Sequence, residues 1–156
     1  MSATDCRDSE LVDAYAPLVV DRDTAALYRG WLARELRVCR CGACGHRFLP
    51  PRPLCPRCWS TEIGTEPVSG QGTIHLAIRL HQGPPAAGVD YAAAPHPVVT
   101  VELDEQPGLR FTSTAVDSPP DALAIGARVE LVWIERNRVP FPAFRVTSTG
   151  AETPPS

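Results

Sequence analysis

The chain has 156 residues, a formal net charge of −3 and a hydrophobic fraction of 44%. This length fits one modest domain or two very small ones, and no apolar run approaches the roughly 18 residues that a membrane-spanning helix needs. All 15 basic residues are arginines. The acidic balance disfavours nucleic-acid binders as a class, because they usually carry a basic excess.

The first segment, residues 1–20, shows no sustained hydrophobic period, and we predict a flexible N-terminus with Cys6 as a free thiol. Its opening residues are polar and acidic, unlike a secretory signal or a transit peptide. We therefore expect a cytoplasmic protein.

Residues 21–37 have the pattern of an amphipathic helix, with Asp23 or Thr24 at its N-cap. Gly30 inside a helix costs on the order of 1 kcal/mol relative to alanine, so we expect another group to approach it closely. Tyr28 and Trp31 supply a large apolar area to this helix. Docking on another subunit and packing on its own domain are equally favoured by this pattern.

Residues 38–64 contain two Cys-x-x-Cys pairs, Cys41/Cys44 and Cys55/Cys58, with ten residues between them. This spacing lets two turns bring four sulfurs to one metal ion, and four thiolates are the usual ligands of structural zinc. We predict a zinc ribbon, with rubredoxin-type iron as the alternative. Cys39 lies two residues before the first pair, and its spacing suits a ligand less well.

A four-sulfur site leaves no coordination position open for water or substrate, so the metal is predicted to be structural. A thioredoxin-like redox role would need a βαβ context that the sequence lacks. No histidine lies at a useful spacing from a nucleophile or carboxylate, and we predict no catalytic residue. Several arginines around the cysteines leave a local basic surface possible: Arg34, Arg37, Arg40, Arg47, Arg52 and Arg57.

Residues 65–148 alternate between short strand patterns and turns, which predicts a small Greek-key barrel of the OB type. In the first strand, Ile74, Leu76, Ile78 and Leu80 alternate and are expected to share one face. The residues 82–97 form a long loop with Tyr91 and His96, and loops of this length are usually functional or disordered. Residues 149–156 are predicted to be a disordered tail. The five expected strands are 73–80, 98–103, 109–115, 128–134 and 143–147, with a short helical link at 121–126.

The order of these parts resembles a known family. A helix with Leu27-Tyr28-Arg29-Gly30-Trp31 precedes the first cysteine pair, a Pro50-Pro51-Arg52 stretch lies between the pairs, and Ser69-Gly70-Gln71-Gly72-Thr73 follows. This arrangement closely resembles the zinc-ribbon OB-fold proteins known as domain of unknown function 35, also described as acyl-CoA-associated. The resemblance covers about residues 24 to 147.

The resemblance implies an accessory subunit, without catalytic residues of its own, that braces a thiolase-superfamily enzyme and helps to form its CoA-substrate channel. Expected partners are an aldolase or thiolase subunit, assembled as a heterotetramer, and a hot-dog-fold hydratase; the breakdown of steroid side chains is the expected setting. Structural zinc and acyl-CoA are the expected ligands of the complex. We assign partner docking to Tyr28, Trp31, Arg47 and Arg52, and the acyl-CoA vicinity to Tyr91 and His96.

Two other classes remain open. A zinc ribbon and an OB fold also occur in single-stranded nucleic-acid-binding modules, and that reading predicts salt-dependent binding. A rubredoxin-like electron carrier would hold iron and be red.

Overall fold

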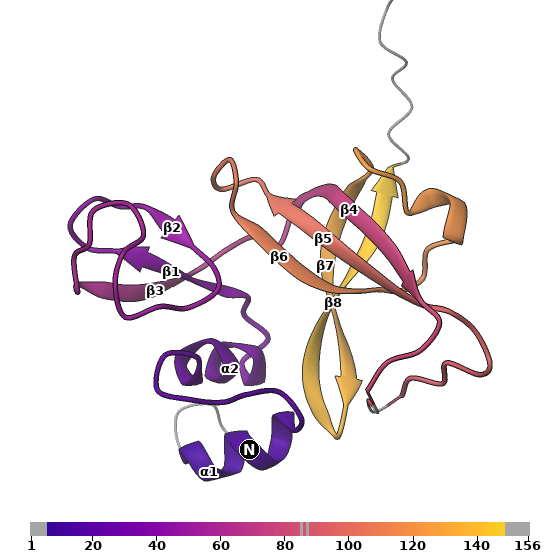
Figure 1. Ribbon diagram of the computed structural model, residues 1–156, viewed down its shortest axis with the longest axis horizontal. Helices are drawn as coiled ribbons and strands as arrows, with labels where there is room; N and C mark the ends of the chain where they lie inside the picture. Colours follow the sequence, from indigo (N-terminus) through magenta and orange to yellow (C-terminus); the bar gives the residue numbers. More distant parts are fainter. Residues whose placement is uncertain (1–5, 85, 87, 149–156) are drawn as a thin grey trace, which may run out of the picture. The chain divides into compact units, whose positions relative to one another are not determined.

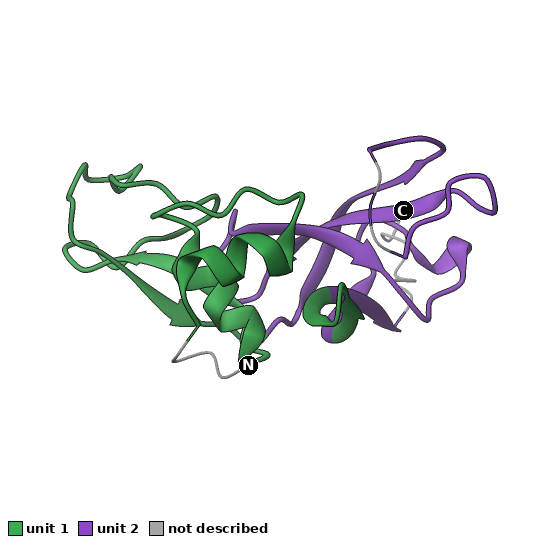
Figure 2. Ribbon diagram, turned by 90° about the horizontal axis from the view of Figure 1, so that it is seen from below, with its two compact units in different colours: residues 1–69, 133–142 green, residues 70–132, 143–156 purple. Residues whose placement is uncertain are grey.

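The computed structural model describes residues 6–84, 86 and 88–148, and its chain divides into two compact units (Figure 2). Unit 1 comprises Met1–Ser69 and Trp133–Pro142, and unit 2 comprises Gly70–Val132 and Ala143–Ser156. The tail predicted at 149–156 lies outside the described residues. Among the described helices, none is both long and apolar enough to cross a bilayer.

Helix α1 (Asp8–Tyr15) occupies the segment that we predicted to be flexible (Figure 1). Leu11 and Tyr15 lie one turn apart on the same side and are 0% and 3% exposed. The backbone amide of Arg7 donates to the Glu10 carboxylate (2.7 Å), which holds the first turn. Cys6 is buried as well. Two anchors in eight residues are too short a pattern to stand out in the sequence, and their packing stabilises the helix.

Helix α2 (Ala25–Leu32) is shorter than the predicted 21–37. Thr24 takes the N-cap position, and Arg34 turns the chain out of the helix with a φ of 57°. The close approach expected at Gly30 is present: a Cβ atom there would lie 2.8 Å from carbons of the Arg37 side chain. A larger residue at this position would displace the strand that follows.

A three-stranded antiparallel sheet follows, in the order β2-β1-β3. Its strands are β1 (Arg37–Cys41), β2 (Arg47–Phe48) and β3 (Ile63–Pro67). Leu27 from α2 packs with Cys39 and Phe48 in a buried cluster, against which Leu49 and Ile63 also lie. Cys39 is therefore a core residue of unit 1, and burial raises the pKa of its thiol.

Five strands close into a barrel in the order β4-β5-β6-β8-β7, with β6 and β8 parallel. The predicted fold class, mainly β with a zinc ribbon followed by a small OB-fold barrel, is confirmed. Phe111 is partly buried and contacts the fully buried Phe144 at 6.1 Å between ring centroids, so it packs against the core. The strands are β4 (Gly72–Leu80), β5 (His96–Leu103), β6 (Arg110–Ala115), β7 (Arg128–Arg136) and β8 (Val139–Ser148), with the 3₁₀ turn η1 (Pro120–Ala122) before β7.

The predicted single apolar face of β4 is wrong, because a β-bulge interrupts it. Ile74 pairs with Val101 and Leu76 with Thr100, which leaves His75 as an extra residue. One extra residue reverses the facing of everything after it. Ile74 is 1% exposed, whereas Leu76 and Ile78 are 47% and 44% exposed.

The strands β7 and β8 form a longer hairpin than the sequence indicated. Asn137 and Arg138 join them with φ values of 49° and 65°, the pair of positive angles that defines a type I′ hairpin turn. The tip of this hairpin, residues 133–142, belongs to unit 1, while the remainder of both strands belongs to the barrel. Each unit therefore contains part of one continuous hairpin.

Candidate metal centre

Two turns of the same construction carry the four cysteines. In the first, the amide of Cys41 donates to the carbonyl of His46 (2.9 Å), and the amide of Gly45 donates back to Cys41 (2.9 Å). In the second, Cys55 donates to Ser60 (2.9 Å) and Trp59 to Cys55 (3.0 Å). The two knuckles thus repeat one hydrogen-bond pattern, residue for residue.

Both knuckles require a left-handed residue directly after the second cysteine. Gly45 has a φ of 72° and Trp59 a φ of 63°. Glycine adopts this conformation without steric cost, whereas an L-residue with a Cβ is destabilised by roughly 1–2 kcal/mol. Trp59 therefore destabilises the turn that it occupies, relative to glycine.

The four sulfurs converge as the spacing predicted. All lie within 4.8 Å of one another, and Cys41 to Cys58 and Cys44 to Cys55 are 3.5 and 3.7 Å apart. A tetrahedral zinc ion with Zn–S bonds of about 2.3 Å places its sulfurs about 3.8 Å apart. The residues present fit a zinc ion, which would cross-link the two knuckles.

The knuckle backbone prepares one of these thiols for ionisation. The amide of Cys44 lowers the pKa of the Cys41 thiol to about 6, and a hydrogen bond with Cys58 acts in the same direction. The Ser60 amide lowers the pKa of Cys58, but hydrogen bonds with the other three cysteines and burial together outweigh it and raise that pKa to about 12. Cys41 is therefore the first thiolate to form, and a divalent cation offsets the repulsion among the remaining sulfurs.

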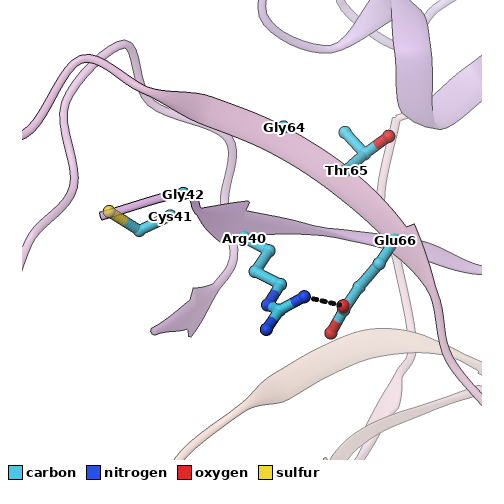
Figure 3. A pocket seen from close by; sticks show the side chains of 6 residues that line it. All are labelled: Arg40, Cys41, Gly42, Gly64, Thr65 and Glu66. Carbon is cyan, nitrogen blue, oxygen red and sulfur yellow. Dashed lines mark ion pairs between the residues drawn. The ribbon is translucent and has the colours of Figure 1, made fainter. Parts of the chain in front are cut away.

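A shallow hollow of about 300 Å³ lies beside Cys41 on the sheet of unit 1 (Figure 3). Arg40 reaches across it to Glu66 at 3.3 Å. Arg47, predicted to contact a partner, makes a second ion pair with the same carboxylate. Its charge is therefore compensated within the sheet. The hollow is lined by Arg40, Cys41, Gly42, Gly64, Thr65 and Glu66.

The aromatic residues predicted for docking lie in an intramolecular cluster of unit 1. Trp31 is only 7% exposed; its ring contacts Tyr15 and Phe141, each at 5.5 Å between centroids. Tyr28 is half-buried and stacks on Tyr15 at 5.0 Å. Packing on the chain's own domain, one of the two alternatives kept open above, is therefore observed, and docking by Tyr28 and Trp31 stays a prediction. Arg52 is exposed in the loop between the knuckles.

Tyr91 and His96 meet in the loop that enters β5. Their rings make an edge contact at 6.2 Å, and the Tyr91 hydroxyl donates to the Pro84 carbonyl at 3.4 Å. His96 pairs with Leu80 across the barrel strands. By the strand register, His96 lies two residues along the strand from the position opposite the exposed Ile78.

Comparison with known proteins was made on sequence and on structure. Residues 30–64 match the profile described as "ChsH2, rubredoxin-like zinc ribbon domain", and residues 65–134 match "ChsH2, C-terminal OB-fold domain". A "DUF35 domain-containing scaffold protein" of Methanocaldococcus jannaschii is 33% identical over 67% of this chain and 74% of its own length. The chain belongs to the DUF35 family.

Two further comparisons are informative. A "Probable enoyl-CoA hydratase alpha subunit" of Thermomonospora curvata is 34% identical over 81% of this chain, and the chain spans 38% of that relative's length. The structure described as "Ltp2-ChsH2(DUF35) aldolase" superposes with a TM-score of 0.73 at 32% identity. The match covers 84% of this chain and 99% of the other.

Sequence reasoning passed over two features of this DUF35 chain. Phe141 joins the helical aromatic cluster from a hairpin tip more than a hundred residues away, and no local pattern signals that contact. The unusual position of Trp59 does have a signal in the sequence. Alignment of the two Cys-x-x-Cys pairs places Trp59 where the first pair has Gly45.

Proposed function

We propose that this chain is a non-catalytic accessory subunit of an aldolase- or thiolase-type enzyme that acts on acyl-CoA thioesters. The likeness to the Ltp2-ChsH2(DUF35) aldolase carries the proposal, because it extends over nearly the whole of the matched chain at 32% identity. The relatives named as scaffold proteins support the same role.

In this role the metal centre is architectural. Four thiolates would complete the coordination of zinc and leave no position for a substrate. The zinc would fix the two knuckles and the loop between them as a rigid surface. The residues that react with substrate would then come from the partner subunit.

The barrel would contribute to the substrate channel. Leu76 and Ile78 form an apolar strip on its outer side, and His96, which contacts Tyr91, lies two residues along the strand from the position opposite Ile78. An apolar strip beside polar groups suits the acyl chain and pantetheine arm of a CoA thioester. Within this proposal the bulge at His75 has a purpose, since it turns the strip outward.

The finer assignment rests on the family resemblance. We assign the partner to the thiolase superfamily, with assembly as a heterotetramer and a steroid side chain as the acyl group. The hydratase name of the Thermomonospora relative supports a hot-dog-fold hydratase as a further partner.

Purification of the tagged chain from its own host tests the proposal. We expect a thiolase-superfamily subunit in a fixed ratio, identified by mass spectrometry. The purified complex should cleave or transfer an acyl-CoA thioester, whereas neither subunit alone should do so. Turnover by the isolated chain would contradict the accessory role, and so would a chain that recovers only nucleic acid.

The charge of the barrel counts against the nucleic-acid alternative. Residues 70–132 and 143–148 contain four arginines and seven carboxylates. Single-strand-binding barrels combine a positive groove with stacking aromatics. The outward strip here carries leucine and isoleucine instead.

A further inference from the structure

The second metal knuckle carries a residue that its own fold does not favour. Gly45 and Trp59 hold equivalent positions, with the same backbone hydrogen bond and the same sign of φ. Glycine suits that conformation and tryptophan is strained in it. Backbone strain alone identifies no ligand, so the surroundings of Trp59 decide what it is for.

Trp59 also gains little from packing, since it is 74% exposed. This is the largest exposed fraction among the large apolar side chains of the described residues, the others being Val12, Leu18, Val19, Leu54, Leu76, Ile78 and Ile125. Neither the turn nor the core of unit 1 explains a tryptophan here. Tryptophan is, however, among the residues that contribute most to protein interfaces.

The neighbouring residues supply the rest of an interface. The segment 52–59 includes Leu54, 40% exposed, and two exposed arginines, Arg52 and Arg57. The segment contains no carboxylate. Within the described residues, the guanidinium groups of Arg52 and Arg57 have no ion pair, whereas Arg40 and Arg47 on the adjoining sheet are paired with Glu66.

We propose that the segment 52–59, here called the knuckle loop, is the surface by which this chain docks on its partner enzyme subunit. Trp59 enters an apolar pocket of the partner, and Arg52 and Arg57 meet carboxylates at the rim of that pocket. This inference rests on the proposed function and adds to it the residues that hold the complex together. Zinc contributes by fixing the loop before the partner arrives.

A protein occupant fits these residues better than a nucleic acid does. A single strand stacks its bases on successive aromatic side chains, and Trp59 is the one aromatic residue in the knuckle loop. A tryptophan beside exposed arginines is the composition of a hot spot between proteins.

The decisive variant is Trp59→Gly, because it removes the side chain and relieves the turn at the same time. We expect unchanged zinc content and an equal or higher melting temperature. The dissociation constant of the complex with the purified partner subunit should rise by at least about tenfold. Ile125→Ala is the matched control, since Ile125 is 71% exposed on unit 2 and its loss should leave that constant unchanged.

Charge reversal gives an independent readout. Arg57→Glu should weaken the complex and remove most of the loss of affinity that salt causes in the wild type. A complex of unchanged affinity with Trp59→Gly would overturn the docking surface and leave the proposed function intact. A wild-type chain that binds no enzyme subunit would overturn both. If nucleic acid copurifies and Trp59→Gly abolishes it, the protein occupant is wrong.

Discussion

At the scale of single residues, the two knuckles separate the cysteines into two kinds. Cys41 and Cys55 are buried ligands with sulfurs facing the common centre, and Cys39 is equally buried but belongs to the apolar cluster. Burial therefore does not distinguish a ligand here. Convergence does, because the sulfurs of the four ligands lie within 4.8 Å of one another, whereas Cys39 packs with Leu27 and Phe48.

Replacement of one ligand should remove the metal. We expect Cys55→Ala to lower the zinc content from about one ion per chain to near zero, because three sulfurs hold the ion much less tightly. Elemental analysis after purification measures this and also distinguishes zinc from iron. Cys39→Ala is the control and should retain the metal. If Cys39→Ala lost its zinc and Cys55→Ala kept it, our assignment of the ligands would be wrong.

An ion pair between the barrel strands predicts a pH dependence. The Arg128 guanidinium donates to both oxygens of Asp104 (2.7 and 2.5 Å), and these hydrogen bonds hold the pKa of Asp104 below its ordinary value. A lowered pKa in the folded state means that the pair stabilises the protein above the ordinary carboxyl pKa. That stabilisation is lost as pH falls through the lowered value.

Asp104→Asn should therefore lower the free energy of unfolding at pH 7 by about 0.2–1 kcal/mol, the range for an exposed ion pair. The difference from the wild type should disappear in acid, because a protonated Asp104 carries no charge and neither does the asparagine that replaces it. Denaturant unfolding across pH 2.5–7 measures it. Asp121→Asn, in the turn η1, is the control. A constant difference at every pH would contradict the role of the charge.

At the scale of elements, α1 shows how a short helix becomes part of a core. Tyr15 donates its hydroxyl to the carbonyl of Pro140 at the hairpin tip (3.1 Å), and its ring contacts both Tyr28 and Trp31. Arg29 of α2 makes an ion pair with Asp8. The helix therefore has partners on α2 and on a segment from the far end of the chain.

Two neighbouring residues of α1 should differ sharply in their effect on stability. Leu11→Ala is expected to lower the free energy of unfolding by about 2–5 kcal/mol, because Leu11 is 0% exposed. Val12→Ala removes a side chain that is 45% exposed and should change it by less than about 0.5 kcal/mol. Chemical denaturation compares the two. If both variants changed the free energy of unfolding by equally small amounts, the result would instead support the flexible N-terminus expected from the sequence.

At the scale of the whole molecule, the two units depend on different sources of stability. Unit 1 has a three-stranded sheet, two short helices and a metal centre, whereas unit 2 is a closed barrel with a continuous apolar interior. A ribbon this small depends on its metal to fold. The barrel has no free strand edge and needs no metal.

Removal of the metal should accordingly affect the units unequally. Treatment with a strong chelator should abolish amide-exchange protection in β1 and β3 while β4 to β6 stay protected. Hydrogen exchange followed by mass spectrometry measures both sets in one sample, and re-added zinc should restore the lost protection. Uniform loss across both units would contradict independent stabilisation.

The sequence by itself determined the parts and their order. Spacing alone identified the four ligands, since two Cys-x-x-Cys turns can present sulfurs to one ion whatever surrounds them. Short strand patterns bounded by turn residues identified all five barrel strands, because turn residues mark where each strand ends. These are local signals, and local reasoning was sufficient for them.

Only the tertiary structure decided which surfaces are free. Trp31 is buried because Tyr15 and Phe141 reach it from distant segments, and Leu76 is exposed because one extra residue, His75, shifts the register. A periodic pattern states which residues share a face and not what covers it. Long-range packing and register are set by the whole chain, so a local sequence pattern does not show which surfaces are exposed and able to function.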